Sequence, residues 1–458
     1  MGLKFLLVLS LLFLCTSQGN AGGQKRQGGS IADSLPQPKI PSIRNCVWEE
    51  DLCNRARPLY IDPDTNDGPY SVLYPPSGEC STKVAKCAQM IVPNGKKVIV
   101  ACTGKNSELL RRKSTYAEAT CLNGRFVDSP GQRVVNTPIV EDSCTKEQKV
   151  EFSEIQQANN LIRPFLLSFE VKGQRNFKVK ILDGIIDENW NAIFTRATQQ
   201  PSVNSVACPD RKDNFVTFSK FSSDVAASYG DNVWYKNVMK STCHLSDKQV
   251  ASLTQGEVIS QMYPSRGSSA LDAKKKYSFR LIKGHLTANR DFSFKYHQDA
   301  TFTYYNVAPQ WQSVNVGPWS VVEDKVRKAA ELAGEMINVI TGTHGDLCLP
   351  MNCGIDQNNN NANCVNVTTF EGSYRLPKLF WKLYYKARES INQATVLVVF
   401  NTLNTDSLQA DKTYNDVIKK CESLPGAVYQ CQFTKFKDIY RDNASARADL
   451  ERLIGNLQ

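Results

Sequence analysis

The sequence has few histidines and lacks several common catalytic signatures. Only four histidines occur among its 458 residues. There is no His-Glu-x-x-His pattern of the zinc peptidases, no Gly-x-Ser-x-Gly nucleophile elbow and no phosphate-binding P-loop. The enzyme classes that these motifs mark are therefore disfavoured. His244, His297 and His344 lack metal-type spacing, and we interpret His344, between Thr343 and Gly345, as a turn residue.

The sequence also lacks an apolar stretch long enough to cross a bilayer. It begins with a short, positively charged segment that ends at Lys4, and residues 5–15 are almost wholly apolar. Small residues follow up to Ala21, which is the layout of a secretory signal peptide. We therefore expect a signal peptide at residues 1–21 and a secreted, extracellular protein without membrane contact.

The charge balance narrows the partners only slightly. The formal net charge is +10. The composition, with 41% hydrophobic and 22% charged residues, is typical of globular proteins. A basic surface is compatible with nucleic acid or another anionic polymer as a partner. Taken alone, this charge is explained as well by the mild basicity of many secreted proteins.

Cysteines are plentiful, with fifteen in the chain. Cys15 leaves with the signal peptide, and an even number in an oxidising compartment indicates a disulfide framework. Seven of the remaining cysteines lie in residues 44–145 and seven in 146–458. If all are paired, an odd number of bridges must join the two regions. Asn366 and Asn443 begin N-glycosylation sequons, which suits a secreted protein.

We divide the mature chain into three parts. Residues 22–43 are rich in Gly, Gln, Ser and Pro and are expected to form a flexible leader. Residues 44–145 have strand-like runs such as Lys97–Ala101, separated by turn signals such as Asn123-Gly124. They predict a small, β-rich domain stapled by disulfides. Residues 146–458 form the larger domain, which carries the candidate chemistry.

The pattern around His285 predicts two strands followed by a helix. Residues 277–281 alternate between apolar and polar and lead into Lys283-Gly284-His285, and residues 300–306 alternate again. Pro318 and Trp319 are well placed to open a helix. Its expected apolar face consists of Val322, Val326, Ala329, Ala333, Met336 and Ile340. This order brings four polar side chains within reach of one another: His285, Asn306, Asn315 and Glu323.

These residue types suit phosphodiester hydrolysis. Histidine titrates near neutral pH, so His285 can remove a proton from water as a general base. The amide oxygen of Asn315 is a hard ligand suited to Mg²⁺, and the carboxylate of Glu323 can order metal-bound waters. The ammonium of Lys283 can hold phosphate oxygens.

Each residue also has a purely structural interpretation. His285 could be a turn histidine, the two asparagines could be loop-forming amides, and Glu323 with Arg327 could be a solvated helix pair. Residues 378–388 interleave lysines with aromatic side chains and could form a nucleic-acid platform. We favour a core strand with solvated lysines for that segment.

The stretch KGHLTANRDF, continued by NVAPQWQSVNVGPWSVVEDKVRK, resembles the DNA/RNA non-specific endonuclease family with its ββα-metal site. It is most similar to secreted arthropod nucleases, both the salivary ones and the gut enzymes that degrade double-stranded RNA. The family pattern is Asp-Arg-Gly-His, then Asn-x-x-Pro-Gln, then Asn, then Glu in the following helix. The spacing of Asn306, Asn315 and Glu323 matches this pattern. Residues 337–342 and 376–382 resemble later core strands of the family.

The resemblance implies an α+β fold, with a ββα-metal core in a mixed or antiparallel sheet flanked by helices. It implies that His285 is the general base, that Asn315 binds one Mg²⁺ or Mn²⁺ directly, and that Glu323 holds metal-bound waters. Asn306 would support the site geometry. The implied substrates are DNA and RNA, double- or single-stranded, with little sequence preference.

Two departures from the family pattern leave alternatives open. Ile282-Lys283 replaces the family's Asp-Arg, and lysine keeps the charge but loses the bidentate fork of arginine. The family also uses an upstream arginine on the phosphate, for which we favour Arg266 over Arg280. The first hypothesis is an active metal-dependent endonuclease. The second is a secreted nucleic-acid-binding protein with weakened or lost catalysis, and the third is a disulfide-rich structural protein with chance motifs.

Overall fold

Ile43–Gln458 forms one compact unit of the chain. A computed structural model describes residues 44–67, 70–80, 87–130, 137–155, 162–173, 175–187, 191–199, 208, 215–216, 240, 246–248, 281–350, 364–366, 368–369, 374–386, 388–402, 411–441 and 454. The expected signal peptide, the expected leader and Arg266 lie outside the described residues. No helix among the described residues is long and apolar enough to span a membrane.

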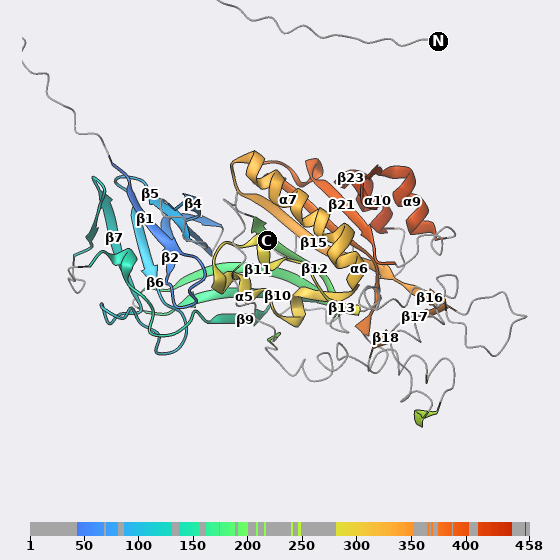
Figure 1. Cartoon of the computed structure of the whole chain (residues 1–458), viewed down its shortest axis with the longest axis horizontal. Coiled ribbons are helices and arrows are strands. Elements are labelled where there is room, and N and C mark those ends of the chain that lie inside the picture. The colour runs from blue at the N-terminus through green and yellow to red at the C-terminus, as the bar shows by residue number, and fades with distance from the viewer. Residues whose placement is uncertain are drawn as a thin grey trace, which may run out of the picture. The chain divides into compact units, whose positions relative to one another are not determined.

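The N-terminal region contains two antiparallel sheets (Figure 1). The run Lys97–Ala101 forms a strand with the predicted bounds. Asn123 and Gly124 both have positive φ, of 49° and 82°, and form the predicted tight turn. The first sheet has the order β1(Cys46–Asp51), β5(Cys87–Val92), β4(Pro76–Glu79), and the second β3(Tyr70–Leu73), β2(Leu59–Asp67), β6(Lys97–Ala101), β7(Tyr116–Leu122), β8(Arg125–Asp128).

Disulfides tie this region together and attach it to the rest of the chain. All seven of its cysteines are paired, and only the Cys53–Cys208 bridge leaves the region. The predicted covalent link between the two groups of cysteines is therefore confirmed. The bridges within the region are Cys46–Cys121, Cys80–Cys87 and Cys102–Cys144, and Cys421–Cys431 lies in the second half of the chain.

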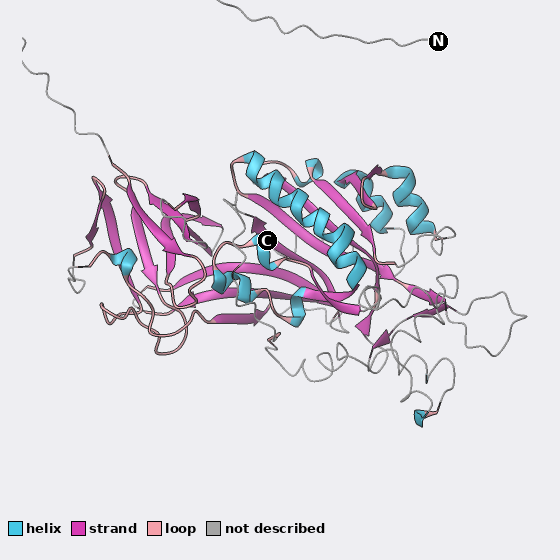
Figure 2. Cartoon of the chain, in the orientation of Figure 1, coloured by secondary structure: helices cyan, strands magenta, loops and turns pink. Residues whose placement is uncertain are grey.

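The second part of the chain is built on a nine-stranded sheet in which every neighbouring pair is antiparallel. Strands predominate over helices in the described residues, as Figure 2 shows. The predicted α+β class is confirmed. The strand order is β22(Glu422–Leu424), β23(Val428–Gln432), β21(Thr395–Phe400), β20(Pro377–Lys386), β15(Ile337–Asp346), β12(Ala192–Gln199), β11(Phe177–Asp187), β10(Ile162–Val171), β9(Val150–Glu154).

Both faces of the central strand β20 are covered, which explains its nearly continuous apolar sequence. On one face, Phe380 packs against Trp319, with ring centroids 5.5 Å apart. On the other face, Trp381 packs against Phe436 and Tyr440 at 5.5 and 6.2 Å. These two rings belong to α10(Phe433–Arg441), near α9(Lys412–Lys420). The sheet is thus enclosed between α10 and the segment that carries the candidate site.

That segment begins with a two-stranded ladder of β13(Leu281–His285) and β14(Val307–Trp311). Between them lie η4(Asn289–Asp291), α5(Lys295–Ala300) and η5(Tyr304–Asn306). Two short helical turns, α6(Gln312–Val314) and η6(Asn315–Trp319), lead into α7(Ser320–Ala333). Figure 1 shows α7 lying across the sheet, and its buried side includes Val322, Val326 and Ala330 at helical spacing.

Two boundaries differ from the prediction. The second strand was expected at residues 300–306, but it occupies Val307–Trp311. The hydroxyl of Thr303 caps a short helical turn that ends at Asn306, so local capping overrides the alternation of side chains. The helix was expected to continue to Ile340, but Gly334 terminates it in a left-handed conformation with φ 62°. Ile340 lies in the following strand instead.

Candidate active site

Strand β13 presents His285 at its last position, opposite Val307 of β14. The residue before it must be glycine. A Cβ atom on Gly284 would lie 2.5 Å from Oε1 and 2.6 Å from Cβ of Gln310, whose side chain is fully buried over the glycine. The Gly-His dipeptide and the later Pro-Gln dipeptide are therefore halves of one packing arrangement.

Two phenyl rings flank the imidazole of His285. The ring of Phe302 lies 4.9 Å away in an edge arrangement, and the ring of Phe215 lies 5.3 Å away. The histidine itself is only partly buried. Its backbone oxygen accepts a hydrogen bond of 3.3 Å from the indole Nε1 of Trp319, just before α7. The strand end is thereby tied to the start of the helix.

Asn306 holds the backbone that follows His285. Its side chain is completely buried. The amide oxygen accepts a 2.9 Å hydrogen bond from the backbone N–H of Thr287, and Nδ2 donates to the oxygens of Thr287 and Thr301 at 2.8 and 3.0 Å. These contacts match a supporting role for Asn306.

Lys283 lies on the same face of β13 as His285, because side chains two positions apart share a face. Its ammonium lies 4.5 Å from the ring centre of Phe215 and 5.6 Å from that of Tyr304. A cation over aromatic faces is stabilised by the ring quadrupoles. The charge of Lys283 is therefore held at the ring of Phe215, which also flanks the imidazole of His285.

Asn315 and Glu323 come from consecutive helical elements. Asn315 opens η6 and is partly exposed, and Gly317 inside η6 has non-helical dihedrals of φ −102° and ψ −110°. Glu323 lies in the first turn of α7, with its side chain 17% exposed. Because the helix is kinked at Gly317 and Pro318, the positions of Asn315 and Glu323 do not follow the spacing of one continuous helix. Trp319 belongs to the same short element as Asn315 and links it to His285.

The carboxylate of Glu323 belongs to a buried charge cluster. The guanidinium of Arg327 lies 4.0 Å from it, and the same guanidinium lies 3.0 Å from Asp291. Burial and, to a lesser degree, the negative charge of Asp291 raise the pKa of Glu323 to about 7. Lys382 and Arg327 act in the opposite direction. The two buried carboxylates, of Glu323 and Asp291, therefore share the two cations Arg327 and Lys382. The pKa of Glu323 lies near neutral pH.

Lys382 is a central member of this cluster that the sequence analysis missed. It was expected to be one of several solvated lysines, but its side chain has no exposed surface. Its ammonium donates a 3.1 Å hydrogen bond to the oxygen of Leu286, next to His285, and lies 3.7 Å from Asp291. The alternation of β20 was the available signal, because it places Lys382 on the same face as Phe380.

Two further structural expectations need correction. Arg327 was interpreted as part of a solvated helix pair, but it is 9% exposed and bridges α7 to Asp291. His344 was interpreted as a turn residue, yet it is a buried member of β15 and packs 4.4 Å from the ring of Tyr440. Burial lowers the pKa of His344 to about 4 and that of His297 to about 3. Both histidines are therefore neutral core residues at physiological pH.

Residues 216–436 match the sequence profile of the DNA/RNA non-specific endonuclease family. This segment of the chain belongs to that family. A protein from Lutzomyia longipalpis named "Salivary endonuclease" is 46% identical over 326 residues, which cover 68% of this chain and 63% of that protein. The chain thus spans less than two thirds of the length of this relative. The predicted family and the predicted likeness to salivary relatives are both confirmed.

A solved structure of the EndoG/EndoGI complex is also similar, with a TM-score of 0.25 and 16% identity over 48% of this chain and 71% of that chain. The endonuclease segment contains β13, β14 and α7, and it supplies five strands of the nine-stranded sheet: β15, β20, β21, β22 and β23. The other strands, β9 to β12, precede the matched residues.

The donors of the endonuclease site fit a small divalent cation. Asn315 offers an amide oxygen that makes no hydrogen bond to any residue that the structure describes. Glu323 offers a carboxylate that its nearest cation, Arg327, approaches only to 4.0 Å. Hard oxygen donors of this kind are those that Mg²⁺ and Mn²⁺ prefer.

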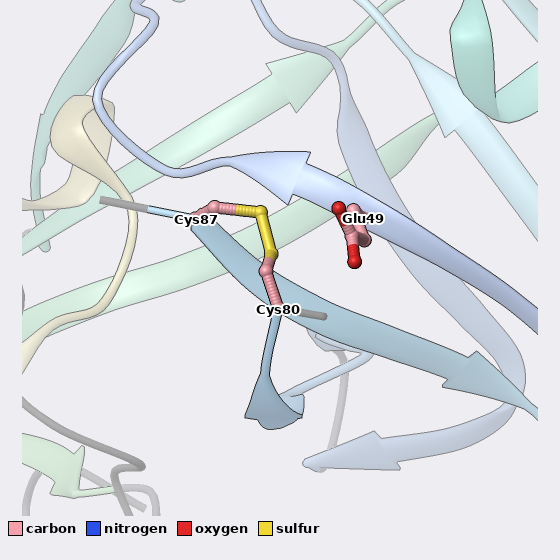
Figure 3. Close-up of side chains that lie close together, drawn as sticks. All are labelled: Glu49, Cys80 and Cys87. Atoms are coloured by element: carbon pink, nitrogen blue, oxygen red, sulfur yellow. A yellow bond between two sulfur atoms is a disulfide. The ribbon is translucent and has the colours of Figure 1, made fainter. Parts of the chain in front are cut away.

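A second group of potential ligands does not fit a metal. Atoms of Glu49, Cys80 and Cys87 lie within 4.8 Å of one another. Figure 3 shows, however, that the two cysteines are joined in a disulfide beside the carboxylate. Metal binding requires thiolates, which a disulfide does not provide. This cluster in the N-terminal region is therefore structural.

Proposed function

We propose that this chain is a secreted, metal-dependent endonuclease that hydrolyses phosphodiester bonds of DNA and RNA, in double or single strands, with little sequence preference. The observation that carries the proposal is the β13–β14–α7 unit within the endonuclease segment. That unit holds His285 at a strand end and ties it through Trp319 to the helix of Glu323.

In this proposal His285 is the general base. Its imidazole can remove a proton from an attacking water while the phenyl rings restrict its orientation. Asn306 keeps the following backbone in place through its three hydrogen bonds. A precisely held base matters because small displacements of a catalytic group reduce rates strongly.

Asn315 would hold one Mg²⁺ or Mn²⁺, and Glu323 would accept hydrogen bonds from the waters around it. When bound, the ion stabilises the negative charge that develops on the phosphate. Lys283 would contact phosphate oxygens from its place beside His285, and Arg266 would add a second cation. Because a nearby cation favours the ionised carboxylate, the raised pKa of Glu323 would fall when the ion binds.

An extracellular location is part of the proposal. It is supported by the signal-like residues 1–21 and by disulfides in the described part of the chain. The two sequons at Asn366 and Asn443 suit the same route. Digestive fluid or saliva is the setting that the likeness to a salivary endonuclease favours.

The second candidate is a secreted nucleic-acid-binding protein with weakened catalysis. It is favoured by Ile282 and Lys283, which stand where the family has Asp-Arg. Tight, salt-sensitive binding with negligible turnover at saturating Mg²⁺ would support it. Recovery of cutting in the double variant Ile282→Asp, Lys283→Arg would support it further.

The deciding experiment measures degradation of plasmid DNA and of double-stranded RNA by the full chain, with Mg²⁺ and with a chelator. We expect both substrates to be cut only with the metal ion. The variant His285→Ala should lose at least about 100-fold in rate, the usual contribution of a general base. Lys435→Ala is the matched control, because Lys435 is exposed on α10 across the sheet from the site. Full activity of His285→Ala would contradict the mechanism.

A further inference from the structure

A short loop of the N-terminal region contacts two separate segments of the second part of the chain, residues 146–458. The loop follows β1 and spans residues 52–55. The oxygen of Leu52 accepts a 2.8 Å hydrogen bond from the backbone N–H of Lys295 at the start of α5. Cys53 is bonded to Cys208, and Nε of Arg55 lies 2.6 Å from the carboxylate of Asp299. A backbone hydrogen bond, a disulfide and an ion pair therefore anchor this loop.

The first anchored segment, α5, is connected to His285 through Phe302. Asp299 lies near the end of α5, and its backbone oxygen accepts a 3.2 Å hydrogen bond from the N–H of Phe302. The ring of Phe302 forms the closer aromatic wall of His285, at 4.9 Å. A displacement of α5 at Asp299 would therefore move the ring that contacts the proposed base.

The second anchored segment supplies the other wall. Phe215 follows Cys208 along the chain, and its ring lies 5.3 Å from that of His285 and 5.3 Å from that of Phe302. The two segments are also joined to each other, because the backbone N–H of Val216 donates a 2.8 Å hydrogen bond to the oxygen of Phe302. The Arg55–Asp299 ion pair thus connects the loop to the first wall, and the Val216–Phe302 hydrogen bond connects the first wall to the second.

Close packing does not by itself fix these walls. A cavity of about 200 Å³ lies beside the loop, lined among others by Arg55, Asp299, Val216 and Phe302. Where side chains border empty or water-filled space, they lose the contacts that hold a close-packed core. Asp299 is 11% exposed and is also paired with Lys295, so its carboxylate is well placed to transmit a restraint.

We infer that residues 52–55 are a positioning element of the nuclease site: through Arg55–Asp299 and Cys53–Cys208 they fix Phe302 and Phe215, and thereby the imidazole of His285. The inference rests on the proposed function and assigns a task to the N-terminal region. Arg55 acts through other residues and does not touch the substrate. Its loss should therefore lower kcat and leave KM nearly unchanged.

The test compares Arg55→Met with Arg55→Lys and with Lys96→Met. Lys96 makes an exposed ion pair of 2.9 Å with Asp64 in the same region and serves as the control. Two quantities are measured on the full chain: kcat and KM with plasmid DNA and Mg²⁺, and the NMR chemical shift of the His285 ring proton. His285→Ala identifies the resonance among the four histidines.

We expect Arg55→Met to lower kcat by about tenfold and to shift the His285 resonance, since misplacement far from the chemistry is costly. Arg55→Lys should recover most of the activity, and Lys96→Met should match the wild type. An unchanged kcat in Arg55→Met would overturn the inference, and so would a lower kcat without a shift of the resonance. If Arg55→Met does not fold, Arg55→Gln replaces it with the same two criteria. If the wild type cuts no substrate, the proposed function fails, while the resonance still tests the positioning of His285.

Discussion

Two of the buried charge clusters in the described part of the chain, one around Arg112 and one around Glu323, differ in how completely their charges are paired. In the N-terminal region, Arg112 is 2% exposed and lies 3.0 Å from Asp128 and 3.3 Å from Asp142. It also donates to the backbone oxygen of Thr137. Asp142 in turn accepts hydrogen bonds from two backbone N–H groups. Every charge in this cluster has a close partner.

The cluster of the endonuclease site is less complete. Glu323 has its nearest cation at 4.0 Å, and its pKa is raised to about 7 by burial and by the charge of Asp291. A buried carboxylate with incomplete compensation costs stability. The difference teaches that the first cluster is compensated within the fold, whereas the second is not, as is common at functional sites.

The largest expected effect is on stability and concerns the first cluster. Arg112→Met leaves Asp142, which is fully buried, without its cation. We expect the free energy of unfolding to fall by about 3–5 kcal/mol, as is usual when one partner of a buried ion pair is removed. Denaturant unfolding measures this change, and nuclease activity of the folded variant should remain.

Lys113→Met is the control for that experiment, because Lys113 makes an exposed pair with Glu108 at 3.8 Å. Such pairs contribute less than about 1 kcal/mol. Equal destabilisation by the two variants, or loss of activity in folded Arg112→Met, would remove the distinction between the clusters.

The next effect is on activity and concerns the second cluster. Glu323→Gln keeps the shape of the side chain but removes the charge that orders metal-bound waters. We expect a rate about 10–100-fold lower, the typical effect of changing a residue behind the metal ligands. Glu331→Gln, on the exposed side of the same helix, should cut substrate like the wild type. Normal turnover by Glu323→Gln would show that its charge is not used.

The smallest effect is a dependence of stability on pH. The pKa of Glu323 is about 7 in the folded chain, above the ordinary value of 4.5 for a glutamate. Between these values the folded state binds more protons than the unfolded state, so this contribution is full below pH ~4.5 and is lost as the pH rises through 7. Relative to the wild type, Glu323→Gln should gain on the order of 1–3 kcal/mol of unfolding free energy between pH 5 and pH 8, measured with a chelator. A difference that does not change with pH would contradict the raised pKa.

Local signals in the sequence predicted parts of the N-terminal region correctly and were less successful around the site. The strand Lys97–Ala101 and the turn at Asn123-Gly124 follow from short patterns that need no distant partner. The strand expected at residues 300–306 was misplaced because a hydroxyl cap competes with the apolar alternation. The helix end was missed because Gly334 was not weighed against a continuing apolar pattern.

The candidate residues could be chosen from the sequence, but their electrostatic surroundings could not. Asp291 and Lys382 reach Glu323 from separate elements, and no spacing in the sequence connects them. The pairing of β12 with β15 is equally non-local. Roles for His285, Asn315 and Glu323 therefore remain proposals that the variants above address.

The pairing of β12 with β15 also has a kinetic consequence. The register joins Gln199 to Ile337, so all the residues between them, including His285, Asn306 and Glu323, form one long connection between neighbouring strands. Closing such a loop costs chain entropy before the strand–strand contacts that compensate for it have formed. Sheets with distant pairings therefore fold slowly. The chain must finish synthesis through Ile337 before this gap in the sheet can close. The candidate site is thus completed late, between two halves of the sheet that are translated before and after it.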